Sequence, residues 1–421
     1  MFRFVHAADL HLDSPFSGLL DVAPHVASIL QKATFDAYDT IVDLCIERAV
    51  DALLVAGDIF DSADRSLKAQ LHFVAGLERL NEAGIRAFIC HGNHDPLDGW
   101  EAAIPFPSNA HRFRSEVECV PLDPDDASSP VVCGVSYPTR EVRQSLVPLF
   151  PERAAGRLTI GLLHANVGSG TGHDPYAPCS PGDLEATGYD YWALGHVHSR
   201  QVIRERSPAV VYSGNTQGRN PNETGARGVY LVELAGDGGV ELEFVPVDAV
   251  RWERIVVSID EIEDDGALLD AAERATEKAL AAAEGRTLVY RLQIGGRGSL
   301  HDSLARAGYL EDLRANLNDL WTGRRPMAFC GRIDDLTRSA IDREELLRGQ
   351  DFIGDLLRLV DEAGEDERMV LDLRESLRPL FEHTRARRYL RDEMPSPEGV
   401  RDLLDAAEEL ALDGLLDGDR G

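Results

Sequence analysis

The chain has 421 residues, 43% of them apolar and 28% charged, which is typical of a soluble globular protein with room for two or three domains. No apolar run approaches the ~18 residues of a membrane span, and Met1–His6 carries no signal-peptide pattern, so we expect no membrane segment. The net charge of −30 argues, taken alone, against a protein that binds phosphate backbones, because such surfaces are normally basic.

Strands and helices alternate over the first ninety residues. Apolar runs predict strands at 3–8, 53–56 and 86–90. Apolar residues at helical spacing predict helices at 34–50 and at about 66–83, the second closed by Gly84. Such alternation predicts parallel strands joined by right-handed crossovers.

Further strands are expected beyond residue 130. Apolar runs at 131–135, 158–163 and 191–194 predict three of them, and 210–213, 229–234 and 240–245 are expected as antiparallel strands that complete a second sheet. The stretch 166–181 is rich in Gly, Pro and Ser and predicts a long loop. His173 in this loop suits either a substrate contact or a solvent-facing position.

Asp, Asn or His follows directly where five of these apolar runs end. Open α/β sheets carry their chemistry at this edge. Carboxylate and amide oxygens together with imidazole nitrogens form a mixed donor set that suits Mn²⁺, Fe²⁺ or Zn²⁺. The residues are Asp9, His11, Asp58, Asn93, His164, His196 and His198.

The order of these motifs resembles that of the calcineurin-like metallophosphoesterase superfamily. The motifs are Asp-x-His at 9–11, Gly-Asp-x-x-Asp at 57–61, Gly-Asn-His-Asp at 92–95, the lone His164, and Gly-His-x-His at 195–198. The sequence Ala-Asp-Leu-His-Leu-Asp-Ser-Pro-Phe at 8–16 resembles that of the SbcD and YhaO-type DNA-repair nucleases in particular. This resemblance implies a two-sheet α/β/β/α sandwich core, a small α+β cap domain and a C-terminal helical region.

A dinuclear metal centre is the site that the resemblance implies. It makes Asp58 the carboxylate shared by both ions, since two ions ~3.5–4 Å apart need a short common ligand. Mn²⁺ is the expected metal, with Fe²⁺ or Zn²⁺ as alternatives. The resemblance assigns Asp9, His11 and His198 to one ion, and Asn93, His164 and His196 to the other.

The same resemblance assigns roles to residues that are not metal ligands. His94 would contact the phosphate and help to protonate the leaving oxygen, and the Asp61 carboxylate would orient His94. The polar turn at 214–225 would lie at the rim of the active site, with Arg219 as a substrate contact. His173 is the other candidate substrate contact.

Three parts are expected along the chain: a nuclease domain at 1–250, a cap at 251–335 and a helical region at 336–421. Strands at 255–259, 287–294 and 327–331 and helices at 267–283 and about 300–320 are expected in the cap. A plain structural domain remains the alternative for this part. Amphipathic helices from about Leu346 to Leu412 would either bind a partner or pack on their own chain.

The resulting interpretation is a Mn²⁺-dependent phosphodiesterase that acts as a DNA exonuclease in DNA repair, with endonuclease activity left open. By resemblance its partners are DNA and an SbcC-like, SMC-type ATPase that binds the C-terminal helices, and a homodimer is left open. Two alternatives remain: a phosphoesterase for a small or nucleotide phosphodiester substrate, and a non-catalytic scaffold subunit.

Cysteine usage bears on the compartment. The six cysteines are scattered and contain no Cys-x-x-Cys pair. We therefore expect reduced, mostly buried thiols and a cytoplasmic protein.

Overall fold

The computed structural model describes residues 1–16, 24–61, 66–102, 104–153, 156–168, 176–236, 238–341, 343–382 and 394–416. His173 lies outside the described residues. Contacts divide the chain into two units, Met1–Arg338 and Ser339–Gly421. None of the helices in the described ranges is long and apolar enough to cross a membrane.

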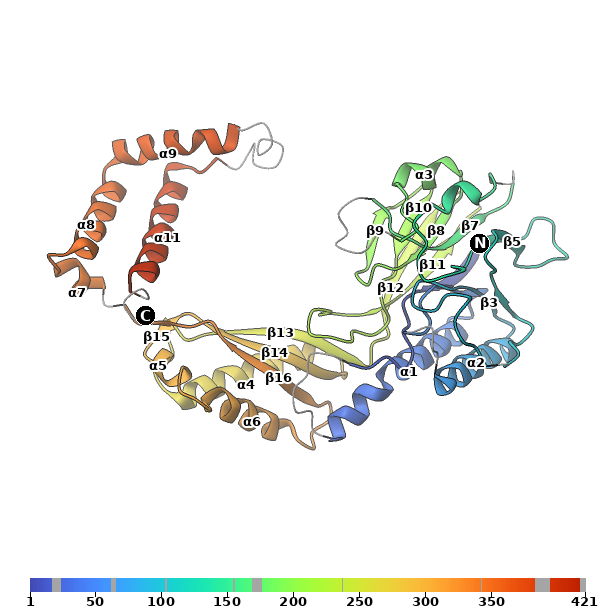
Figure 1. The fold of residues 1–421 in the computed structure, drawn as a ribbon, viewed down its shortest axis with the longest axis horizontal. Coiled ribbons are helices and arrows are strands. Elements are labelled where there is room, and N and C mark those ends of the chain that lie inside the picture. The colour runs from blue at the N-terminus through green and yellow to red at the C-terminus, as the bar shows by residue number, and fades with distance from the viewer. Residues whose placement is uncertain are drawn as a thin grey trace. The chain divides into compact units, whose positions relative to one another are not determined.

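Two six-stranded sheets pack against each other in the N-terminal part of the first unit (Figure 1). The first sheet has the order β12–β11–β1–β2–β3–β4 and contains β1 (Phe2–Ala7), β2 (Ala52–Ala56), β3 (Arg86–Cys90), β4 (Ala110–Arg112), β11 (Gly228–Leu234) and β12 (Val240–Pro246). The second has the order β5–β6–β7–β8–β10–β9 and contains β5 (Glu118–Pro121), β6 (Val131–Gly134), β7 (Thr159–His164), β8 (Tyr191–Gly195), β9 (Gln201–Arg204) and β10 (Ala209–Tyr212).

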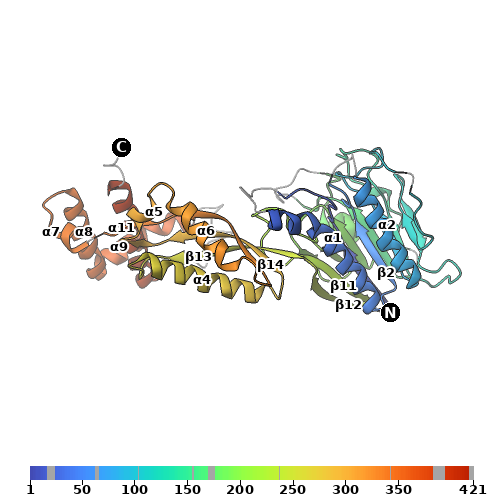
Figure 2. The ribbon, with the colours of Figure 1, turned by 90° about the horizontal axis from the view of Figure 1, so that it is seen from below.

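Successive side chains of each strand point to opposite faces of its sheet, so each sheet has one core on either side. In β2, Leu53 and Val55 belong to the core beneath α1 (Pro24–Glu47) and α2 (Leu67–Glu82), whereas Leu54 belongs to the core between the sheets. Figure 2 shows both helices on the same face of β2. The outer face of the second sheet is covered by α3 (Pro181–Ala186) and a short 3₁₀ turn at Val147–Leu149. The predicted α/β/β/α sandwich is therefore confirmed.

Strand pairing confirms one part of the prediction and corrects another. β1, β2 and β3 pair in parallel, as the alternation of strands and helices predicted. The expectation that β10, β11 and β12 complete a second sheet as antiparallel strands is confirmed for β10, which lies in the second sheet and pairs antiparallel with β9, and is wrong about the sheet that contains β11 and β12. β11 pairs antiparallel with β1, so β11 and β12 extend the first sheet, and β10 pairs in parallel with β8.

Helix α1 begins ten residues earlier than the predicted Thr34. Its first turns carry Val26 and Leu30, which pack against Trp252 and Val289 from strands far along the chain. Because the start of this helix is stabilised by contacts with residues distant in sequence, the local apolar pattern did not predict it.

A three-stranded parallel sheet forms the rest of the first unit, in the order β13 (Val250–Ser258), β14 (Thr287–Gly295) and β16 (Ala328–Asp335). Helices α4 (Asp265–Ala282), α5 (His301–Leu304) and α6 (Tyr309–Trp321) share one core with this sheet (Figure 1). The single helix expected at about 300–320 is two helices, separated before Tyr309 by Gly308 with φ of 86°. The short strands β15 (Arg297–Gly298) and β17 (Arg338–Ser339) follow β14 and β16.

The second unit is helical, as expected. It contains α7 (Arg343–Arg348), α8 (Phe352–Glu365), α9 (Glu367–Glu382) and α11 (Pro397–Leu416). Ser396 precedes α11 and its hydroxyl accepts a hydrogen bond from the Gly399 amide at 3.1 Å, which caps the N-terminus of this helix. Leu357, Val370 and Val400 are buried.

The expectation of six reduced cysteines is wrong for one pair. β5 and β6 pair antiparallel and bring Cys119 opposite Cys133, with Cα atoms 4.0 Å apart, and a disulfide joins them. The sequence separation of 14 residues gave no sign of this, because strand register decides it. The other four cysteines are free and buried: Cys45, Cys90, Cys179 and Cys330.

Candidate metal centre

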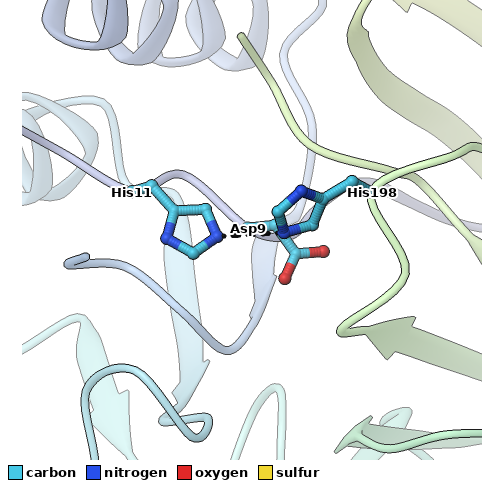
Figure 3. A group of neighbouring side chains, drawn as sticks. All are labelled: Asp9, His11 and His198. Atoms are coloured by element: carbon cyan, nitrogen blue, oxygen red, sulfur yellow. Dashed lines mark hydrogen bonds between the residues drawn. The ribbon is translucent and has the colours of Figure 1, made fainter. Parts of the chain in front are cut away.

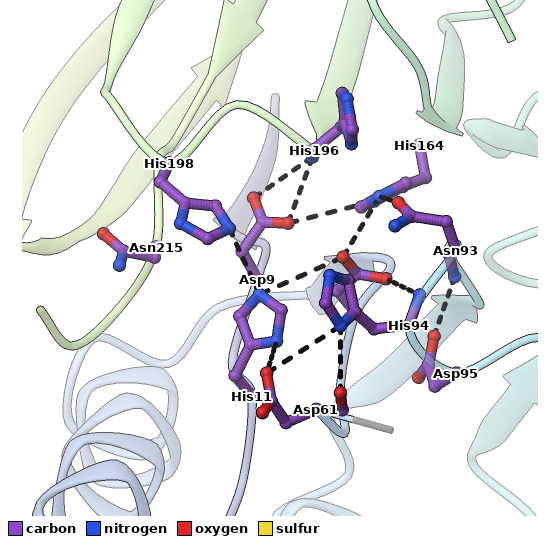
Figure 4. Close-up of polar contacts among 12 residues, drawn as sticks. Asp9, His11, Asp61, Asn93, His94, Asp95, His164, His196, His198 and Asn215 are labelled. Carbon is purple, nitrogen blue, oxygen red and sulfur yellow. Dashed lines mark hydrogen bonds and ion pairs between the residues drawn. The ribbon is translucent and has the colours of Figure 1, made fainter. Parts of the chain in front are cut away.

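The polar residues predicted from the strand ends converge where the two sheets meet (Figure 4). Asp9 and His11 follow β1, and Asp58 follows β2. His164 is the last residue of β7, in the other sheet, and its Nδ1 donates a hydrogen bond to the main-chain oxygen of Ala56 at 2.9 Å. This bond joins the ends of the two sheets that carry the predicted ligands.

Four of these residues have backbone conformations that are rare for residues other than glycine. Asp9, His11, Asp58 and His196 have φ of 51°, 43°, 50° and 98°. Each such conformation costs of order 1–3 kcal/mol and persists only where the surroundings hold it. Here Asp9 and His11 donate main-chain hydrogen bonds to the oxygens of Gly57 and Asp58 at 3.1 and 3.0 Å. The two loops therefore hold one another in the strained conformation.

Close packing at the centre leaves no room for a side chain at Gly92 or Gly195. A Cβ on Gly92 would lie 2.3 Å from Asp58 Oδ1 and 2.7 Å from His164 Nε2. A Cβ on Gly195 would lie 1.8 Å from the main-chain oxygen of Ala56. The glycines of the Gly-Asn-His-Asp and Gly-His-x-His motifs thus make room for the side chains around them.

One cluster consists of Asp9, His11 and His198, whose donor atoms lie within 4.8 Å of one another (Figure 3). The Nε2 atoms of His11 and His198 face each other at 3.2 Å. The main-chain amide of His196 donates to both oxygens of the Asp9 carboxylate, at 3.1 and 3.2 Å.

A second cluster consists of Asp9, Asp58 and His164, all three buried. Asp58 Oδ2 lies 3.3 Å from His164 Nε2 and 3.9 Å from His11 Nε2, so this carboxylate lies between the two clusters. Asn93 Oδ1 lies 3.0 Å from His164 Nε2. The His196 ring packs edge-on against the His164 ring, with centroids 5.2 Å apart, and is not part of any of the described clusters.

A third cluster brings His94 and Asp61 together with His11. His94 Nδ1 is 2.9 Å from the main-chain oxygen of Asp61 but 3.8 Å from its carboxylate. The carboxylate instead lies 3.1 Å from His11 Nδ1 and accepts a hydrogen bond from Arg219 Nη1 at 2.5 Å. The main chain of Asp61, rather than its carboxylate, is the nearer partner of His94. The His94 side chain remains 35% exposed and is open to a substrate.

Burial and neighbouring charges shift the pKa values of the two buried carboxyl groups and of His164. Burial raises the pKa of Asp9, and the charge of His164 only partly offsets it. Burial acts the same way on Asp58, but the charge and hydrogen bond of His164 lower the pKa of Asp58 well below its usual range. Burial opposes a charge on His164, yet Asp58 and Asp9 outweigh it and raise its pKa to about 9. Two buried carboxyl groups thus face one imidazolium, and divalent cations would supply the positive charge that favours the ionised form of both.

The donor set fits two divalent ions. Carboxylate oxygens, an amide oxygen and imidazole nitrogens lie within the two adjoining clusters, with Asp58 between them, and this is a combination that Mn²⁺, Fe²⁺ and Zn²⁺ accept.

Residues near the predicted substrate contacts complete the site. Arg219 is 14% exposed and donates to Asp61 and to Ser14 Oγ, at 2.5 and 2.7 Å. Sequence analysis missed Glu223, whose Oε1 lies 2.7 Å from His198 Nδ1, and no local signal distinguishes it from a solvated acid. Asp95 belongs to the Gly-Asn-His-Asp motif but was assigned no role; it accepts hydrogen bonds from the amides of Ile59 and Gly92 at 2.9 and 2.8 Å and so joins the loops that follow β2 and β3.

Family models match both parts of the first unit. Residues 2–200 match calcineurin-like phosphoesterase, and residues 252–338 match the middle domain of metallophosphoesterase YhaO. The chain is 34% identical over 406 residues to an uncharacterized metallophosphoesterase, YhaO, of Bacillus subtilis, covering 96% of each chain.

More distant relatives match a shorter region. The chain is 23% identical over 250 residues to the DNA double-strand break repair protein Mre11 of Sulfurisphaera tokodaii, covering 56% of this chain and 60% of that protein. It is also 23% identical over 291 residues to a subunit of the nuclease SbcCD of Bacillus subtilis, covering 61% of this chain and 70% of that protein.

Proposed function

The chain belongs to the calcineurin-like metallophosphoesterases, with YhaO as a relative over nearly its whole length, and on this premise we propose that it is a Mn²⁺-dependent DNA exonuclease of DNA repair. The convergence of two carboxylates and three histidines at the joined strand ends, beside a partly exposed His94, carries this proposal. The names of the distant relatives, a repair protein and part of a nuclease, support DNA as the substrate.

We assign Asp58 as the carboxylate shared by two ions. The position of its Oδ2 between His164 and His11, at 3.3 and 3.9 Å, supports this role. Asp9, His11 and His198 would complete one site, and Asn93, His164 and His196 the other. When bound, two such ions lower the pKa of a water molecule and neutralise charge on the phosphoryl oxygens.

The other residues would orient the substrate and move a proton. His94 Nδ1 is held by the Asp61 carbonyl, which leaves Nε2 for the phosphate and the leaving oxygen. The His94 amide donates to Asp58 Oδ1 at 2.9 Å, so the acid and the proposed bridging carboxylate keep a fixed spacing. Loss of His94 should therefore affect the reaction more than the binding of metal.

A division into three parts accompanies this proposal: a nuclease domain at 1–250, a cap at 251–335 and a helical region at 336–421. The middle strands border the rim turn, because Trp252 Nε1 donates to the main-chain oxygen of Gly218 at 2.8 Å. A cavity of about 230 Å³ lies beside this contact, lined by Pro221, Asn222, Trp252, Tyr290, Arg291, Gly331 and Arg332. A cap at this position would shape access for a long substrate.

The helical region is the proposed binding site for an SbcC-like, SMC-type ATPase in the cytoplasm. Several of its large apolar side chains are exposed, including Phe352 and Leu410, both at 68%. Truncation after Arg338 should leave metal-dependent hydrolysis of short substrates unchanged and abolish ATPase binding, measured by gel filtration with the purified ATPase. An inactive or insoluble truncated protein would instead assign these helices to the protein's own fold.

The substrate is tested directly. Purified protein is incubated with Mn²⁺ and end-labelled single- or double-stranded DNA, with a small phosphodiester ester alongside and chelator as the control. We expect metal-dependent shortening of DNA. Hydrolysis of the small ester alone would favour a small or nucleotide substrate, and no hydrolysis of either would favour a scaffold subunit.

A further inference from the structure

We propose that Glu223 is a positioning residue. Together with Arg219 and Asp61, it fixes the tautomers of His11 and His198, the two histidines proposed to share an ion with Asp9. This inference rests on the proposed metal centre and deepens it. None of the five strand-end motifs contains Glu223 or Arg219.

The contact between Glu223 and His198 sets the tautomer of the ring. Glu223 Oε1 lies 2.7 Å from His198 Nδ1, and the Glu223 residue is only 9% exposed. An ionised carboxylate can only accept hydrogen bonds, so the proton of the neutral ring lies on Nδ1. The lone pair is then on Nε2, the atom that points toward His11 and Asp9.

Asp61 takes the equivalent place behind His11. Its Oδ1 lies 3.1 Å from His11 Nδ1, a close contact although outside good hydrogen-bond alignment. Two carboxylates thus stand behind two rings whose Nε2 atoms are 3.2 Å apart. In the metal-free protein this contact is a hydrogen bond, so one of the two Nε2 atoms carries a proton. A cation between the rings and the Asp9 carboxylate would instead need a lone pair on both Nε2 atoms, with both ring protons on Nδ1, where the two carboxylates lie.

Arg219 connects the two carboxylates. Its main-chain amide donates to Glu223 Oε2 at 2.7 Å, and its Nη1 donates to Asp61 Oδ1 at 2.5 Å. Ser14 Oγ accepts a second hydrogen bond from Nη1 at 2.7 Å. A single residue therefore fixes the distance between the groups behind both histidines. We assign Arg219 to this supporting role in place of the predicted substrate contact.

Replacement of Glu223 by glutamine removes one of its two contacts, with His198 or with the Arg219 amide, and leaves the shape of the side chain nearly unchanged. In wild type the two donors contact different oxygens, His198 Nδ1 facing Oε1 and the Arg219 amide donating to Oε2. The Gln side chain has an oxygen at only one of these two positions, so in the same pose it can accept from only one of the two donors. Glu118→Gln is the matched control, because Glu118 Oε2 lies 2.9 Å from His111 Nε2 in a pair that belongs to none of the described metal clusters.

Titration with Mn²⁺ by calorimetry is the first measurement. Glu223→Gln should lower the affinity for one of the two ions by ~10–100-fold, the usual effect of removing a hydrogen-bond partner of a metal ligand, and leave the affinity for the other within a few-fold of wild type. Glu118→Gln should bind both ions as the wild type does. Wild-type affinity for both ions in Glu223→Gln would overturn the inference. An equal loss at both sites with lower thermal stability would also overturn it, since the residue would then only hold the loop together.

A second measurement uses the wild-type protein and does not depend on how the variant folds. Nitrogen chemical shifts of ¹⁵N-histidine in the metal-free protein report the tautomer, with His198 assigned from a His198→Asn variant. At a pH at which the ring is neutral we expect the proton on Nδ1, and a neutral ring with its proton on Nε2 would overturn the inference. If the wild-type protein bound no Mn²⁺ at all, the proposed metal centre itself would be wrong. If instead wild type and Glu223→Gln bound Mn²⁺ equally well, only the role of Glu223 would be wrong.

Discussion

Addition of one methyl group at Gly92 should disable the centre while the protein still folds. In Gly92→Ala the new Cβ would lie 2.3 Å from Asp58 Oδ1, about 1 Å short of the 3.4 Å at which ordinary contact begins. Asp58 Oδ1 is held by the His94 amide at 2.9 Å, and His164 is held by the Ala56 oxygen at 2.9 Å, so neither side chain can retreat freely.

The expected magnitudes follow from this displacement. Overpacking by one methyl costs ~1–3 kcal/mol, which a protein with ~5–15 kcal/mol of stability tolerates. Metal ligands must hold their positions within ~0.5 Å, and a ~1 Å misplacement can cost ~10²-fold in rate.

The assay combines metal analysis of the dialysed protein with Mn²⁺-dependent hydrolysis of a small phosphodiester. Gly92→Ala should bind less metal, and its kcat/KM should fall at least ~10²-fold. Gly295→Ala is the matched control, because a Cβ there meets no atom within 4 Å. Two full equivalents of metal with wild-type turnover in Gly92→Ala would refute the reasoning.

Three further sets of variants test separate parts of the site and the fold. Asp58→Ala should empty both metal positions and abolish hydrolysis, whereas His198→Ala should mainly empty one, and two equivalents of metal in Asp58→Ala would contradict a shared ligand. At saturating Mn²⁺, His94→Gln should keep both ions while kcat falls by ~10²–10⁴-fold, and normal turnover would assign the proton to another group. Asp61→Asn should lower kcat less, because the main-chain oxygen that holds His94 remains. Burial lowers the pKa of His6 from 6.5 to about 3, so its contribution to stability is full above pH 6.5 and is lost as the pH falls toward 3. Urea unfolding of the metal-free protein should show the stability difference between wild type and His6→Asn shrinking by ~2 kcal/mol from pH 7 to pH 5, and an unchanged difference would contradict a neutral buried His6.

The strand-end residues could be predicted from the sequence because each stands directly after a local apolar run. Asp58 after β2 and His164 at the end of β7 are examples, and parallel pairing brings such ends to one edge. Sheet membership could not be predicted in the same way. The run at 229–234 reads as a strand, but its partner β1 lies more than 200 residues earlier, and only the packed fold selects that pairing.

The supporting residues escaped prediction for the same physical reason. Glu223 lies on a polar turn, where an acid is ordinarily solvated, and becomes a partner of His198 only because the turn folds back across 25 residues. Asp61 was predicted, yet its carboxylate contacts His11 and Arg219 more closely than His94. Spacing along the chain identifies which residues approach a site, whereas the atom that makes each contact depends on three-dimensional packing.

Backbone strain connects the stability of this fold with its chemistry. Asp9, His11, Asp58 and His196 occupy left-handed conformations that favour glycine, so local preference and fold disagree at the proposed ligands themselves. The strain and the burial of the Asp9 and Asp58 carboxylates both oppose folding of the metal-free chain. A cation that binds only the folded protein offsets this cost through its binding free energy. The centre is therefore held by two opposing contributions: the interlocked loops impose the geometry, and the charge that this geometry concentrates favours the ions that would stabilise it.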